Sequence, residues 1–370
     1  MGGFLERNFP FFEVFTNPAQ LRNVPLTPLS VTGLPNYVPT PLSAPVEPPV
    51  GVSVELMSKN MQPDVAYAWN FGVQQRVTNA MSFSMTYVGT RGLHLFRRYN
   101  LNTPPPGDAA FNSRLPYQYF NGDGQQYATN IGYAAANGSS IYHALQTELK
   151  LNFSRGLAGR INYTWSKEID DMNMWWPLAD RYNRGEGTNQ APSIPQNFIA
   201  SLVYSLPFGR GQRWLSNGPR PAGWVLGGWQ ASTITKLQSG NPLTFNAAYD
   251  NLGSGVTNRA DVTCSHVKTI GSVSEWFDTS CFTTPAPLQL GTSGSGKVHG
   301  PGYYNSDFSL SKSEAIHDRM RVAVQVDAFN VTNTPHYSNP DTSLSDSNFG
   351  QIGGTNGTPR EIQLGLHFTF

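Results

Sequence analysis

Charged side chains are scarce in this 370-residue chain, at 13% of residues, about half the share usual in soluble globular domains. Lys and Arg (25) nearly balance Asp and Glu (24), so no basic excess points to nucleic acid as a partner. Segments rich in the helix-forming residues Leu, Ala, Glu and Lys are rare, whereas Gly (36) and Pro (28) are plentiful. At this length the chain can hold one large β domain or two ordinary ones.

Long apolar runs are absent as well. No stretch approaches the roughly 18 consecutive apolar residues that mark a transmembrane helix. The opening MGGFLERNFPFFEVF lacks the basic region and apolar region of a secretory signal, so an export address would have to lie upstream of residue 1. A membrane is not excluded by this, because a transmembrane β-strand needs only about 10 residues of alternating character.

Alternation of apolar and polar residues is what the sequence does contain. Residues 1–60 show no sustained period, and we expect an irregular extracellular loop or partial strand there. Beyond them, period-2 alternation predicts nine strands. They fall in the segments 67–74, 81–92, 142–156, 158–168, 197–209, 223–240, 304–313, 319–333 and 359–370.

The connections between these strands alternate in length. Those near Asn79, near Gly156 and at 314–318 are tight and the one at 207–223 is moderate, whereas those at 88–140, 167–196, 239–303 and 333–358 are long. Short turns facing the periplasm and long loops facing outward are typical of outer-membrane barrels. With tight turns in the periplasm, the last strand ends there too.

The composition of the two strand faces favours lipid on one side. The polar face is dominated by Ser, Thr, Asn, Gln and Gly rather than by the Lys and Glu of a water-facing sheet, which suits a barrel lumen. Aromatic residues gather near strand ends, as expected of the girdles at membrane interfaces. The predicted girdle residues are Trp69, Tyr87, Tyr163, Trp165, Trp224, Trp229, Tyr303, Tyr304 and Phe329.

Nine strands cannot close a barrel alone. An open sheet edge in hydrocarbon leaves backbone groups unpaired at several kcal/mol each, and bacterial single-chain barrels have even strand numbers. The sequence therefore predicts an arc of a larger barrel, with Met1 an internal start or a truncation.

Two alternatives stay open at this point. Soluble β-sandwiches also alternate, so a secreted β-domain that binds carbohydrate through aromatic-rich loops is one. An outer-membrane enzyme of the lipase-barrel type is the other, although the sequence contains no G-x-S-x-G or H-E-x-x-H motif. We predict no enzymatic activity and no cofactor.

Several segments resemble the C-terminal half of TonB-dependent outer-membrane receptors, in particular the Oar-like group that carries a carboxypeptidase-regulatory-like domain. The resemblance runs in order from about residue 64 to the end. Its segments are YTWSKEIDD (163–171), NFIASLVYSLPFGRG (197–211), GGWQASTITKLQSGNPLT (227–244), WFDTSCFTTPAP (276–287), HGPGYYNSDFSLSKS (299–313), FNVTNTPHYSNPD (329–341), NFGQIGG (348–354) and PREIQLGLHFTF (359–370).

This resemblance implies that residues 61–370 are an all-β, antiparallel segment of about nine C-terminal strands from a 22-stranded transmembrane barrel. It implies a Gram-negative outer-membrane location and energised uptake of an unknown substrate in the full-length protein. The partners would be outer-membrane lipid, the barrel-assembly machinery, and the TonB complex through an N-terminal region that this chain lacks. The terminal residues would form the signal read by that machinery: Ile362, Leu364, Leu366, Phe368 and Phe370.

Three candidate sites remain to be weighed. Cys264 and Cys281 in the longest loop predict a disulfide, with a weak metal site including His266 as the alternative. GTSGSGKV (291–298) nearly spells a phosphate-binding loop, but Val298 replaces the required Ser or Thr, so we expect a flexible surface loop. Glu168, Asp170 and Asp171 form an acidic group that we expect to be solvated.

Overall fold

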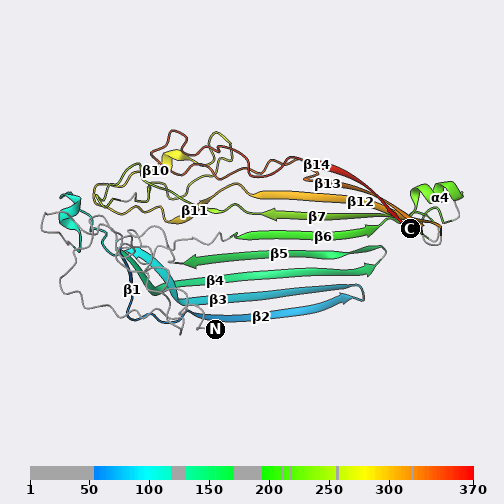
Figure 1. Ribbon diagram of the computed structural model, residues 1–370, viewed down its shortest axis with the longest axis horizontal. Helices are drawn as coiled ribbons and strands as arrows, with labels where there is room; N and C mark the ends of the chain where they lie inside the picture. The colour runs from blue at the N-terminus through cyan, green and yellow to red at the C-terminus, as the bar shows by residue number, and fades with distance from the viewer. Residues whose placement is uncertain are drawn as a thin grey trace, which may run out of the picture.

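One antiparallel sheet dominates the computed structural model, which describes residues 54–117, 131–154, 156–170, 194–209, 212–216, 219–255, 258–317 and 320–370 (Figure 1). The strand order is β14-β13-β12-β7-β6-β5-β4-β3-β2. Neighbours along the chain are thus mostly neighbours in space. These strands are β2 (Val65–Thr78), β3 (Met81–Asn100), β4 (Ile131–Ser154), β5 (Leu157–Asp170), β6 (Gln196–Ser205), β7 (Trp229–Gln238), β12 (Tyr303–His317), β13 (Met320–Phe329) and β14 (Glu361–Thr369).

The nine predicted strands are therefore confirmed, in the predicted order. A short tenth strand, β1 (Val54–Met57), pairs in parallel with the first residues of β4 and lies off the main path. Within the described residues β2 and β14 have no pairing with each other, so the sheet is open at both edges.

The two ends of the sheet differ in the length of their connections. The end of β2, the end of β4, the end of β6 and the C-terminus lie toward the right of Figure 1, so the short connections fall at this end of the sheet. The long connections gather at the other end. This is the predicted asymmetry, and it makes the right end in the figure the periplasmic one.

Two strands are longer than predicted. The sequence placed a loop over 88–140, but β3 continues to Asn100 and β4 begins at Ile131. Alternation fails there because β3 contains glycines and a register shift at His94, where φ is 57°. The extended β4 segment is rich in Ala, Gly and Ser, which carry little apolar signal.

One predicted strand begins later than expected. The apolar segment starting at Gly223 belongs to a short helix, α4 (Arg220–Leu226), and the strand starts only at Trp229. Pro221 in the first turn has the fixed φ that a helix start favours. Within the described residues, no helix is both long enough and apolar enough to cross a membrane.

The long connections are not structureless. The described segments 101–117, 239–255, 258–302 and 330–360 fold together, and we call them the extracellular cap. Its regular elements are η1 (Phe111–Arg114), β8 (Pro242–Thr244), β9 (Asp261–Val262), η2 (Thr279–Cys281), β10 (Phe282–Thr283) and β11 (Ser295–His299). β8 pairs with β11, and β9 pairs with β10.

A hydrophobic core lies inside this cap rather than against the sheet. Its centre is Phe245, which packs against Phe277, Phe282 and Phe349 with ring centroids 4.0–6.3 Å apart. The buried members of the core are Leu243, Phe245, Ala260, Val267, Phe277, Cys281, Phe282 and Val298. Aromatic rings at these separations stabilise a core beyond their area alone.

Candidate functional site

Cross-strand register joins the alternating apolar residues into continuous rows on one face of the sheet. Leu364 lies opposite Val326, which lies opposite Leu310 on the next strand. On the other face, Gln363 lies opposite Asp327. The sheet therefore has one apolar face and one polar face, as the wall of a transmembrane barrel requires.

The apolar face is exposed. Leu364 is 80% exposed and Phe71, on the far strand β2, is 73% exposed. A soluble sandwich would bury such a face against a second sheet, so the carbohydrate-binding soluble domain is not favoured. All five residues of the predicted C-terminal signal are exposed: Ile362, Leu364, Leu366, Phe368 and Phe370.

Seven of the nine predicted girdle residues fall into three groups along the strands. Trp69, Tyr87 and Trp165 lie on the apolar face toward the loop end, where Tyr87 Oη is 2.7 Å from His143 Nδ1. Tyr304, the second residue of β12, lies on the same face at the loop end, whereas Tyr163 lies at mid-strand opposite Phe198. Trp229 and Trp224 lie at the periplasmic end.

Two members of that set lie on the polar face instead. By register, Tyr303 shares its row with Gln238 and stacks on His336, with ring centroids 4.3 Å apart. Phe329 is in register with Glu361. Both come at the loop end of their strands, where one residue of difference reverses the face.

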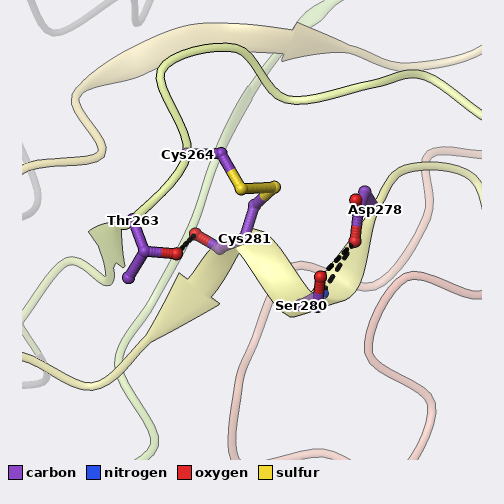
Figure 2. The surroundings of a disulfide bond; sticks show 5 residues. All are labelled: Thr263, Cys264, Asp278, Ser280 and Cys281. Carbon is purple, nitrogen blue, oxygen red and sulfur yellow. Dashed lines mark hydrogen bonds between the residues drawn. A yellow bond between two sulfur atoms is a disulfide. The ribbon is translucent and has the colours of Figure 1, made fainter.

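A disulfide joins Cys264 and Cys281 inside the cap (Figure 2). Thr263 reinforces the link, because both its backbone N–H and its hydroxyl donate to the carbonyl of Cys281. Asp278 opens η2 by accepting from the backbone N–H of Ser280. With both sulfur atoms in this bond, neither is free to bind a metal as a thiolate beside His266.

Polar side chains fasten the loops of the cap to one another. The Asp250 carboxylate accepts backbone N–H groups of Leu252, Ser254 and Gly255, which fixes a tight turn. The guanidinium of Arg114 donates to the carbonyl oxygens of Pro105, Ala109 and Gly253 and so ties the 101–117 loop to that turn.

A second set of hydrogen bonds between the cap loops is buried. The amide of Asn251 donates to the carbonyls of Ala286 and Gln289, each at 2.8 Å. Asn258 donates to Asn251 and also to Gln289. Buried amides with satisfied donors make the position of this loop specific.

A cavity of about 720 Å³ lies where the wall meets the cap. β6 begins at Gln196, opposite Trp165, so the last residues of β5 extend past their β6 neighbour toward β11. The polar and titratable lining residues are His143, Ser166, Lys167, Glu168, Ser295 and His299. Groups of both charges beside apolar surface are what a pocket for a polar ligand needs.

Sequence reasoning did not single out His143, Lys167 or His299. Their proximity depends on the register between β4 and β5 and on the position of β11, which is distant in the chain. No local spacing in the sequence indicates this proximity. Burial lowers the pKa of His299, because the charged imidazolium loses hydration there.

The remaining sequence candidates are placed as follows. Residues 295–298 of the phosphate-loop-like segment lie in strand β11 rather than in a loop, and Val298 is buried in the cap core. Glu168 and Asp170 lie at the end of β5, where Asp170 pairs with Ser140 of β4 and is buried rather than solvated. Asp171 and residues 1–53 lie outside the described residues. Among the described residues, no group of His, Cys, Asp or Glu forms a metal site.

An open antiparallel sheet with one exposed apolar face, short turns at one end and a folded cap at the other defines part of a transmembrane β-barrel wall. Residues 1–363 match the outer membrane beta barrel domain, and the chain belongs to that family. Its location is the outer membrane, as the sequence predicted, and the family is one of membrane barrels rather than enzymes.

Solved structures with a similar fold are outer-membrane transporters and receptors. The transporter YddB from Escherichia coli has 9% identity and a TM-score of 0.47, and the match covers 87% of this chain and 34% of that one. The FrpB iron transporter from Neisseria meningitidis has 11% identity and a TM-score of 0.39, and the match covers 86% of this chain and 33% of that one. The ferripyoverdine receptor from Pseudomonas aeruginosa has 13% identity and a TM-score of 0.43, with 84% of this chain and 28% of that one covered.

This chain thus spans about a third of the length of these transporters. No curated protein matches it in sequence.

Proposed function

We propose that residues 61–370 form the C-terminal part of the barrel of a TonB-dependent receptor, which takes up a substrate across the outer membrane with energy from the inner membrane. The observation that carries this proposal is the open sheet with an exposed apolar face. Among the described residues, β2 and β14 pair with no further strand, and an open edge cannot stand in hydrocarbon, so the wall needs further strands. In the 22-stranded barrel of such receptors the lumen is plugged.

The cap and its cavity are the proposed substrate-binding region of this chain. A hydrophobic core, a disulfide and buried amides hold the cap in one arrangement. A preorganised surface of this kind binds without an ordering cost. The cavity beside Lys167, Glu168 and His299 offers charged and hydrogen-bonding groups to a polar ligand.

The terminal strand has a second proposed role, as the signal that the barrel-assembly machinery reads. Its apolar side chains and final Phe370 are exposed along the edge strand β14. Deleting Phe370 from the full-length protein should lower the amount assembled in the outer membrane. An equal amount of folded barrel without Phe370 would contradict this role.

Energised uptake is tested by comparing two deletions in the native host, one of this locus and one of tonB. Uptake is screened across nutrients, iron chelates and vitamins. We expect at least one compound whose uptake is lost in both strains. A compound lost only with the locus would refute energised transport while leaving the barrel assignment intact.

A further inference from the structure

The connection between β6 and β7 presents an exposed apolar cluster at the periplasmic end. Three consecutive residues of α4, namely Trp224, Val225 and Leu226, are 62%, 56% and 49% exposed. Trp214, earlier in the same connection, is exposed too and stacks edge-on against Phe208. Apolar side chains gathered in this way on a surface mark an interaction site.

Lys312 of β12 holds the helix in place. Its ammonium group donates to the carbonyl oxygens of Trp224 and of Gly227, the latter at 2.7 Å, where the helix ends and its carbonyls lack partners. Glu314 lies 3.2 Å from the same nitrogen. Although charged, the Lys312 side chain is only 10% exposed.

Aromatic rings enclose the same lysine. Its nitrogen lies 5.7 Å from the ring centre of Trp224 and 5.8 Å from that of Trp229. The Trp229 indole N–H in turn donates to the carbonyl of Val225, at 2.9 Å. The helix therefore touches the barrel through side chains of two neighbouring strands, and its orientation is fixed by both.

These contacts place α4 on the outer side of the wall. By register, Lys312 lies opposite Trp229 on one side and Val324 on the other, in the apolar rows that contain Leu310 and Leu366. β7 has its periplasmic end here, at Trp229, and β12 continues from Lys312 to His317. The exposed side chains of α4 thus continue the lipid-facing surface at its periplasmic rim.

We propose that α4 is an interfacial anchor, inserted among the headgroups and upper acyl chains of the periplasmic leaflet, with phospholipid as its ligand. Tryptophan prefers the headgroup level, and short apolar side chains beside it reach the acyl boundary. The Lys312 ammonium group is paired with Glu314 and with two carbonyl oxygens, and a charge is less costly at the interface than at the bilayer midplane. Continuity with the apolar wall favours lipid over a soluble protein as the partner.

Spin-label accessibility tests this proposal directly. A nitroxide is placed on the full-length protein by Val225→Cys, and its exposure to oxygen and to a nickel chelate is measured in isolated outer membranes. Leu364→Cys is the control for the lipid-facing wall, and Tyr249→Cys is the control for an exposed cap position. We expect position 225 to favour oxygen over nickel, as Leu364 does, but less strongly.

Two results would overturn the anchor. Nickel accessibility equal to that of Tyr249→Cys would place the helix in water. Protection from both reagents would mean that protein, not lipid, covers it. Neither result would depend on whether the protein transports anything.

The role of Lys312 is tested in the same labelled protein. Lys312→Met keeps the apolar stem but removes the ammonium group, so we expect the label at 225 to become more mobile and to lose most of its oxygen preference. Lys236→Met is the matched control, because Lys236 also lies over an aromatic ring, that of Tyr303, but on the polar face. An unchanged label in Lys312→Met would refute the holding role of this lysine.

Discussion

Replacing Leu364 with arginine tests the lipid-facing wall through stability. Glu361–Thr369 spans about 30 Å of strand at about 3.3 Å per residue. At the usual tilt of about 45° this covers about 21 Å, most of an apolar band about 25 Å tall. Leu364 is next to the midpoint of the strand, and its side chain is 80% exposed, so an arginine there would sit near the bilayer midplane.

The expected cost is about 2–4 kcal/mol, which lowers the folding equilibrium constant about 30- to 700-fold. The assay is denaturant unfolding of the full-length protein in phospholipid vesicles. Gln363→Arg is the matched control, because Gln363 is the next residue in the strand and lies on the polar face opposite Asp327. We expect this substitution to change the free energy of unfolding by no more than about 0.5 kcal/mol. Equal effects of the two arginines would refute a lipid-facing row.

The cap supports three further predictions. Replacing both Cys264 and Cys281 by alanine should lower the local unfolding free energy of the cap by about 3 kcal/mol, since the disulfide closes a loop of sequence separation 17. Hydrogen exchange of the cap amides measures this loss, and unchanged protection would contradict it. Arg114→Met should detach the 101–117 loop from the rest of the cap, because the loss of the charged hydrogen bonds costs about 1–3 kcal/mol of local stability. Limited proteolysis should then become faster in this loop and not elsewhere. Because burial lowers the pKa of His299, the unfolded chain takes up a proton near pH 6.5 before the folded cap does. Cap stability should therefore be full above about pH 6.5 and fall as the pH drops below it. His299→Gln should flatten this dependence in a pH series of cap hydrogen exchange, and an unchanged dependence in His299→Gln would contradict the assignment to this histidine.

Much of the wall could be predicted from sequence because its signal is local. In β14 every second residue is apolar, and the strand was found where the alternation placed it. The extension of β3 was missed because a register shift at His94 interrupts the alternation, and that of β4 because residues 132–140 carry few large apolar side chains. The GWVL segment was assigned to a strand because four apolar residues fit a strand and a helix turn equally well.

The candidate site could not be predicted in the same way. The cap core joins Leu243, Phe277 and Phe349 from segments far apart in the chain. The cavity joins Lys167 of β5 to His299 of β11. Such contacts depend on the path of long loops, which no short-range period records.

The most direct test of the lipid-facing wall is a nitroxide scan of residues 361–369 in the outer membrane, one cysteine at a time. The wall described above predicts that oxygen accessibility is highest at Ile362, Leu364, Leu366 and Phe368, while the residues between them are polar-facing and favour the nickel chelate. A scan without this two-residue period, or with Leu364 and Gln363 equally open to nickel, would contradict a strand that faces lipid on one side.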